Sequence, residues 1–100
     1  MLGFAMRAGR VTVGTEQVFA LMAKKGSRGV ALLCYAADAS DGAKKKIRTK
    51  SDFYGVKAIE LPLTADEIGR LLGKTYAPVA LAITDARFAD EIDRATRQET

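Results

Sequence analysis

Histidine is absent from this chain of 100 residues, and cysteine occurs once, at Cys34. A zinc site needs several thiolate or imidazole ligands, and Ser-His-Asp or Cys-His catalysis needs an imidazole base. The composition therefore excludes these sites and leaves carboxylates, lysines and hydroxyls for any catalysis. The sequence also has no Walker-type phosphate loop. We expect a protein that is not an enzyme and that has no metal and no cofactor.

Long apolar runs are missing as well. The longest, Val30 to Ala37, is too short to cross a bilayer, and the first residues lack the basic segment and long apolar core of a secretory signal. A single cysteine excludes an internal disulfide, and its place inside this apolar run is typical of a small buried side chain in a reducing compartment. We expect a cytoplasmic protein without membrane contact.

Acidic residues are scarce in the first half of the chain. Residues 1–50 contain ten Lys and Arg against three acids, whereas residues 51–100 contain six against nine, although the net charge of the whole chain is only +4. A strongly basic half indicates a partner that carries phosphate groups.

Helical and strand patterns alternate along one domain that spans residues 1–100. Apolar residues at helical spacing, bounded by caps and glycines, predict helices over Leu2–Ala8, Thr15–Lys25, Asp41–Tyr54, Thr64 to Gly73, and from Asp85 onward. Short apolar runs predict strands at Val11–Val13, Val30–Tyr35, Lys57–Leu61 and Val79–Ile83. This order predicts an α/β fold with a mostly parallel or mixed sheet between two helical layers.

Several polar residues stand where helices begin. Ser40 is a good N-cap, and Thr64 with Glu67 forms the pattern of a capping box. Asp38 and Asp85 each follow a predicted strand and precede a predicted helix. We interpret both as capping residues rather than catalytic ones, because no acid-base partner can be named for them.

The junction at Gly14 has two possible meanings. A glycine between a strand and a helix accommodates a tight turn, since it accepts positive φ without a steric clash. The same arrangement aims the free amide groups of a helix start away from the end of a buried strand, which attracts anions. The sequence leaves both meanings open for Gly14.

The helix predicted over Asp41–Tyr54 is strongly basic. One stripe is apolar or small, whereas the cations spread over the remaining surface at Lys44, Lys45, Lys46, Arg48 and Lys50. Such a run is either a solvated face or a surface for phosphates, and the charge asymmetry of the two halves favours the second.

Loops beyond strand ends are the usual ligand sites of such sheets. Here they include the Gly14 junction, the Asp38–Ser40 turn and the Tyr76–Pro78 loop, and the sequence does not determine whether they share one edge. Tyr76 either stacks on a base or covers the sheet edge. Tyr54 lies on the apolar stripe of its helix and is assigned to the core, whereas Phe53 is left unassigned.

Five short segments resemble, in order and spacing, the YlxQ-like bacterial branch of the kink-turn-binding ribosomal protein superfamily. They are Leu2–Arg10, Gly14-x-Glu16, Ala36–Ser40 followed by Lys44–Lys46, Ile68–Lys74 and Ala82–Asp85. The resemblance implies a three-layer α/β/α sandwich with a four-stranded mixed sheet. It also implies a partner that is structured RNA, either rRNA or another noncoding RNA, in association with the ribosome or the transcription machinery, and no DNA specificity.

In the kink-turn binders of this superfamily, a Gly-x-Asn-Glu-x-x-Lys pattern contacts tandem G·A pairs, and an apolar loop covers a flipped-out base. The matching positions here are Gly14, Glu16, Gln17 and Ala20, and the covering loop is Thr75–Pro78, so three of the pattern's side chains differ. A Glu accepts hydrogen bonds from base amino groups, and a Gln both donates and accepts. The predicted RNA-binding residues are Arg10, Gly14, Thr15, Glu16, Gln17, Lys44, Lys45, Lys46, Thr75 and Tyr76.

A protein-protein interaction module on the same fold is the second hypothesis. Its expected surface is the acidic last helix, with Asp90, Glu91 and Asp93. Charge reversal of the three consecutive lysines separates the hypotheses, since it removes RNA binding and spares a protein partner on the acidic helix.

Overall fold

Strands and helices alternate along the chain as the sequence predicts. A computed structural model of the protein describes residue 9 and residues 11–98. The elements are β1 (Val11–Val13), α2 (Thr15–Lys25), a 3-10 turn (Gly26–Arg28), β2 (Leu32–Tyr35), α3 (Asp41–Tyr54), β3 (Ala58–Glu60), α4 (Ala65–Leu71), β4 (Ala80–Ile83) and α5 (Ala86–Gln98). The helix expected over Leu2–Ala8 lies outside the described residues. The strands after β1 are shorter than predicted, and α4 ends two residues before Gly73.

The four strands form one mixed sheet in the order β1-β4-β2-β3. The last strand lies between the first two, antiparallel to both, whereas β2 and β3 are parallel. Because β1 and β2 both run against β4, they both end at the edge of the sheet where β4 begins. This topology brings together loops that are far apart in the sequence.

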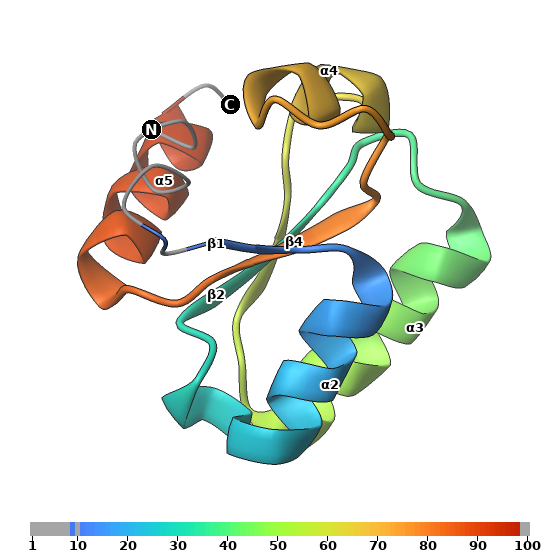
Figure 1. The fold of residues 1–100 in the computed structure, drawn as a ribbon. Helices are drawn as coiled ribbons and strands as arrows, with labels where there is room; N and C mark the ends of the chain where they lie inside the picture. Colours follow the sequence, from blue (N-terminus) through green and yellow to red (C-terminus); the bar gives the residue numbers. More distant parts are fainter. Residues whose placement is uncertain (1–8, 10, 99–100) are drawn as a thin grey trace.

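Helices cover both faces of the sheet, which confirms the predicted α/β/α architecture (Figure 1). On β2, Leu33 and Tyr35 pack with the buried side chains of α2 and α3, whereas Leu32 and Cys34 pack with those of α4 and α5. The alternation follows from strand geometry, in which successive side chains point to opposite faces. The uninterrupted apolar runs at β2 and β4 therefore mark strands that are covered on both sides, as predicted.

Local signals set the helix starts. The Ser40 hydroxyl accepts a hydrogen bond from the Ala43 amide at 3.1 Å, and Thr64 and Glu67 complete the predicted capping box. At the start of α5, the Asp85 carboxylate accepts a bond from the Arg87 amide at 2.8 Å. This bond lowers the pKa of Asp85, as expected for a carboxylate held by a backbone donor. The capping assignments of Ser40, Thr64 and Asp85 are thus confirmed.

Cys34 is buried in the sheet as a free thiol, which confirms its assignment as a core side chain. Burial, with a smaller contribution from Asp93, raises the pKa of Cys34 to about 12. At pH 8 only about one thiol in ten thousand is therefore ionised, and the thiolate is the reactive form. We expect a thiol-specific reagent at pH 8 to leave the native protein unmodified and to react rapidly after denaturation. Rapid modification of the native protein would contradict the burial of Cys34.

Candidate functional site

The three loops singled out from the sequence lie side by side at one end of the sheet. The Gly14 amide donates to the Ala80 carbonyl at 3.0 Å, and the Ala36 amide donates to the Val79 carbonyl at 2.8 Å. The turn after β1, the turn after β2 and the loop before β4 are thereby joined (Figure 1). We call this region the sheet end: Gly14–Gln17, Ala36–Ser40 and Thr75–Val79.

Gly14 joins β1 to α2 in a conformation that favours glycine, with φ 106° and ψ 137°. Its carbonyl accepts the first helical hydrogen bond, from the Val18 amide at 2.9 Å, so Gly14 is the N-cap of α2. No side chain caps this helix start. A Cβ at Gly14 would also overlap the side-chain oxygen of Gln17. The tight-turn meaning of this glycine therefore holds, and no side chain in the described part of the chain accepts a hydrogen bond from the first amide groups of α2.

Three of the predicted contact residues follow Gly14 on α2. Glu16 and Gln17 are exposed, and Thr15 is half-buried. Val18 and Met22 are fully buried and fix the inward face of the helix against the sheet. The side chains of Glu16 and Gln17 are therefore open to a ligand at the sheet end.

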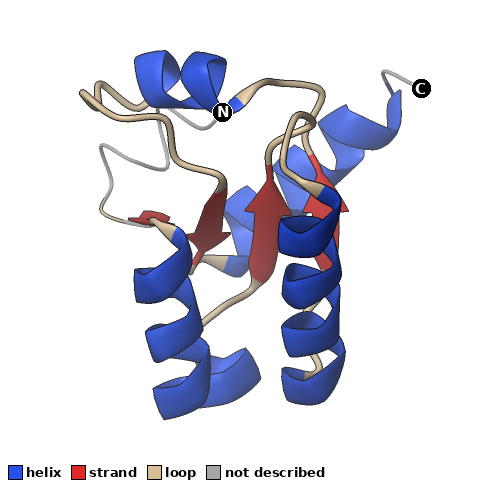
Figure 2. Ribbon diagram, turned by 90° about the vertical axis from the view of Figure 1, so that its right-hand side faces the viewer, coloured by secondary structure: helices blue, strands red, loops and turns tan. Residues whose placement is uncertain are grey.

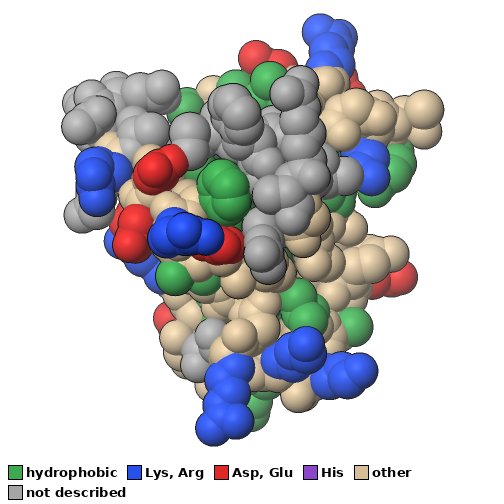
Figure 3. Space-filling view, turned by 60° about the vertical axis from the view of Figure 1, so that its left-hand side comes forward, with side chains coloured by type: hydrophobic (Ala, Val, Ile, Leu, Met, Phe, Trp, Pro, Cys, Tyr) green, Lys and Arg blue, Asp and Glu red, His purple; other side chains and the backbone are tan. Residues whose placement is uncertain are grey.

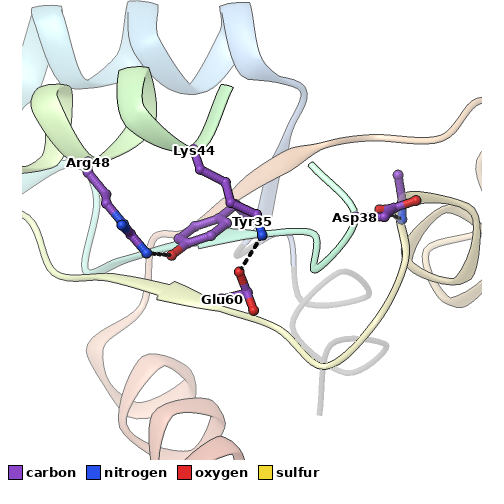
Figure 4. A network of polar contacts seen from close by, with 6 residues as sticks. Tyr35, Asp38, Lys44, Arg48 and Glu60 are labelled. Atoms are coloured by element: carbon purple, nitrogen blue, oxygen red, sulfur yellow. Dashed lines mark hydrogen bonds and ion pairs between the residues drawn. The ribbon is translucent and has the colours of Figure 1, made fainter. Parts of the chain in front are cut away.

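The cations of α3 point in different directions. Ile47 and Ser51 form the buried stripe, as predicted. On one side of that stripe, Lys44 forms an ion pair with Glu60 at 2.8 Å, and the Arg48 guanidinium donates to the Tyr35 hydroxyl at 3.3 Å (Figure 4). These bonds raise the pKa of Lys44 and of Arg48, in each case chiefly through the hydrogen bond. Lys44 and Arg48 thus hold α3 against the edge of the sheet.

On the other side of the stripe, two lysines of α3 face α2. The ammonium groups of Lys46 and Lys50 lie 5.6 and 5.7 Å from the ring centre of Phe19. Lys45 is exposed. The two helices lie side by side and begin at the same end of the sheet (Figures 1 and 2). The structure therefore brings Lys46 and Lys50 beside α2, whereas Lys44 and Lys45 lie toward Glu60.

Phe19 had no role in the sequence-based prediction of the site, and Lys50 was named among the cations of its helix but not among the RNA-binding residues. Phe19 borders the apolar stripe of its helix, between the buried Val18 and Met22, and is half-buried. On a helical wheel, Phe19 lies at the edge of the buried face of α2. The sequence contains no signal for which helix lies beside that edge, because this depends on the sheet topology.

The predicted covering loop rests on α4. Thr75 and Tyr76 are exposed, with Tyr76 at 52% of its full accessibility, and Pro78 is buried. A Cβ on Gly69 of α4 would overlap the Tyr76 carbonyl oxygen and press on the Pro78 ring. The loop borders a shallow hollow lined by Asp66, Gly69, Arg70, Lys74, Thr75, Tyr76 and Ala77. Gly69 therefore allows the loop and α4 to approach closely.

The replacement Gly69→Ala tests this close approach. The added methyl group meets a backbone carbonyl, which cannot rotate away as a long side chain can, so the loop or α4 must move. Overpacking of this kind lowers the free energy of unfolding by about 1 to 3 kcal/mol. We expect denaturant unfolding to show this loss and amide chemical shifts to change mainly over residues 74–79. Unchanged shifts in that segment would contradict the predicted contact.

Asp38 stabilises the sheet end rather than the helix that follows it. Its carboxylate accepts a hydrogen bond from the Ala65 amide at 2.8 Å, and the Ala37 amide donates to the Leu63 carbonyl at 2.8 Å. Asp38 is thus a capping residue, as expected, but for α4 instead of α3, which Ser40 caps. The contact holds the turn after β2 against the start of α4 (Figure 4).

The expectation of an acidic surface that includes Asp93 is wrong. Asp93 is 8% exposed and forms an ion pair with Lys57 at 2.7 Å, which joins α5 to the start of β3. Asp90 and Glu91 are exposed, but so are Arg87 and Arg94 of the same helix, and Figure 3 shows both charges mixed on the forward face. Asp93 faces inward because it lies one helical turn after the buried Ala89, on the same side of α5.

Arg10, one of the predicted RNA-binding residues, lies outside the described residues. Tyr54 is half-buried within the core on the α2 and α3 face, and Phe53 is 80% exposed.

Among the described residues, no three metal-ligating side chains form a cluster. No helix in the described part of the chain has the length and apolarity needed to cross a membrane.

Comparisons with known proteins agree with this fold. The chain matches no protein-family model. The RNA-binding protein YlxQ of Enterococcus faecium is 35% identical over 89 residues, which cover 89% of this chain and 81% of that protein. A solved protein of unknown function from Bacillus halodurans is 27% identical with a TM-score of 0.83, and covers 96% of this chain and 92% of its own.

A more distant neighbour has the same fold. The 15.5-kD RNA-binding protein of Giardia lamblia superposes with a TM-score of 0.74 over 98% of this chain and 82% of its own, at 13% identity. At this identity the likeness concerns the fold alone.

Proposed function

The chain belongs to the YlxQ family, and from this membership we propose that it is a noncatalytic protein that binds structured RNA at the sheet end. A single observation supports the location: the start of α2, the start of α3 and the loop at Thr75–Val79 lie at the same end of the sheet (Figure 1). We further propose that residues 1–100 act as one domain, in the cytoplasm, on RNA of the ribosome or of the transcription machinery.

Each part of the sheet end has a proposed task. The uncapped amides of α2 and the ammonium groups of Lys45 and Lys46 contact phosphates. Gln17 donates and accepts in the groove, and Glu16 accepts hydrogen bonds from base amino groups. Tyr76 stacks on an unpaired base, for which an aromatic ring with an exposed face is suited.

The proposal includes recognition of the kink-turn motif within structured RNA. A kink-turn RNA hairpin and a version in which Watson–Crick pairs replace the tandem G·A pairs provide the test. A loss of affinity of about tenfold or more in the second RNA supports recognition of the G·A pairs, at the scale of a good base contact. Equal affinities limit the proposal to structured RNA without this motif.

Crosslinking in a lysate of cells that produce the protein, followed by sequencing of the attached RNA, tests the function as a whole. Enrichment of one structured RNA supports the proposal. Recovery of a protein and no RNA favours the interaction module instead.

Salt dependence gives an independent test. If the surface neutralises about four to six phosphates, the logarithm of the binding constant falls with the logarithm of salt concentration at a slope of about −3 to −5. We expect this slope in fluorescence anisotropy titrations of the kink-turn hairpin between low and physiological salt. A binding constant that does not change with salt contradicts phosphate contacts.

A further inference from the structure

Two lysines of α3 share one aromatic ring of α2. The Lys46 and Lys50 ammonium groups lie 5.6 and 5.7 Å from the ring centre of Phe19. The two residues are four apart on α3, so they stand on the same side of the helix, one turn from each other. We call Phe19, Lys46 and Lys50 the helix seam.

The seam concentrates positive charge without an acidic partner. Among the described residues, Lys44 and Lys57 pair with Glu60 and Asp93, whereas neither Lys46 nor Lys50 has a carboxylate within 4.0 Å. Like charges four residues apart on a helix repel each other, and the negative face of an aromatic ring offsets this repulsion only in part. A polyanion bound along the seam would offset the remaining repulsion between the two ammonium groups.

The seam also extends in a definite direction. Both helices begin at the sheet end and run side by side away from it (Figure 2). Phe19 stands one turn below the start of α2, and Lys50 lies about 13 Å along α3 from its first residue, at 1.5 Å per residue. The seam thus extends away from the proposed RNA site, along the side on which α2 and α3 face each other.

We propose that the helix seam binds the phosphate backbone of an RNA stem that continues from the sheet end. This inference rests on the proposed function and adds a second contact to it. Lys46 and Lys50 contact phosphates of the stem. Phe19 is a positioning residue that holds both ammonium groups in place, and Lys44 and Arg48 take no part because they bind Glu60 and Tyr35.

The test uses the kink-turn hairpin with two long stems and two versions in which one or the other stem is shortened by half a helical turn. We expect K46Q/K50Q to lower the affinity for the long-stem RNA about tenfold or more and to reduce the salt slope by about two, since each lost phosphate contact reduces it by about one. On the RNA that lacks the contacting half-turn, the single variant K50Q should bind as tightly as the wild type, because Lys50 belongs to the seam alone whereas Lys46 also contacts phosphates at the sheet end.

Two further variants serve as controls. K24Q/K25Q removes the same charge from the last turn of α2, at the far end from the sheet end, and should change the affinity less than twofold. Phe19→Leu keeps an apolar side chain but removes the ring face, and should weaken binding to the long-stem RNA with the salt slope unchanged. Thermal unfolding of all variants identifies any that fail to fold.

The outcomes separate this inference from the proposed function. If the wild type binds the hairpin and K50Q binds it equally well with the same salt slope, the seam is not a contact, and the proposed function stands. A loss in K50Q that is equal on all three RNAs also overturns the inference, because Lys50 then contacts no particular stem. If the wild type does not bind the hairpin at any salt concentration, the proposed kink-turn recognition and the seam both fail.

Discussion

Reversing the charge of Lys44, Lys45 and Lys46 together, in K44E/K45E/K46E, is expected to lower the affinity for the kink-turn hairpin by at least about 100-fold. The variant removes phosphate contacts and adds three carboxylates to the first turns of α3, which repel the RNA backbone. Because Lys44 is paired with Glu60, we expect Lys45 and Lys46 to account for most of the loss. Anisotropy titrations of the triple variant and of K44Q alone measure both effects.

The matched control is K24E/K25E/R28E. It makes the same change in net charge at the last turn of α2 and the 3-10 turn after it, away from the sheet end. We expect it to retain most of the affinity, apart from a long-range effect that disappears at high salt. An equal loss of affinity in the two triple variants would mean that RNA binding depends on the net charge of the protein and not on a particular site.

A protein partner gives a different result. A partner that docks on the exposed face of α5 should bind the K44E/K45E/K46E variant as well as it binds the wild type. The triple variant also replaces the Lys44–Glu60 ion pair by two like charges. Its unfolding midpoint must therefore be measured beside that of the wild type, so that lost binding is not confused with lost structure.

Replacing Gly14 by alanine is expected to lower the free energy of unfolding by about 1 to 3 kcal/mol, the range for a non-glycine residue forced into a glycine conformation. At φ 106° an L side chain is strained, and the new Cβ also displaces the Gln17 side chain. Relief of this strain changes the angle at which α2 leaves β1. RNA affinity should therefore fall as well, under conditions in which the variant is fully folded.

Gly42→Ala is the matched control for this replacement. Gly42 lies in the first turn of α3, has no positive φ, and a Cβ there would meet open space. Alanine is the better helix former, so this variant should be as stable as the wild type or more stable by up to about 1 kcal/mol. Denaturant unfolding of the two variants, which differ only in position, should therefore give effects of opposite sign. A loss of stability in Gly42→Ala equal to that in Gly14→Ala would contradict the strain at Gly14.

The helix boundaries could be read from the sequence because their causes are local. α2 and α3 have the predicted bounds, since Gly14, Ser40 and Gly55 act on the residues next to them. The strands β2 and β4 could also be predicted from the sequence, because a strand covered on both faces carries apolar residues at every position. The strands after β1 are shorter than predicted by one or two residues, because the ends of a strand depend on pairing with strands that are distant in the sequence.

The grouping of the site needed the tertiary structure. The sequence identified Gly14, the lysines of α3 and the loop before β4, yet only the insertion of β4 between β1 and β2 brings the three together. The same holds for contacts between residues far apart in the chain. Lys57 reaches Asp93 across 36 residues, and Lys46 reaches Phe19 on a different helix.

The sequence by itself therefore determined the elements, their inward faces and the sign of the charge that they carry, because propensity, capping and hydrophobic periodicity act within a few residues. The tertiary structure decided which lysines are bound to the sheet and which face α2, and it removed Asp93 from the surface. These outcomes depend on which elements become neighbours, and that is set by the order of strands in the sheet.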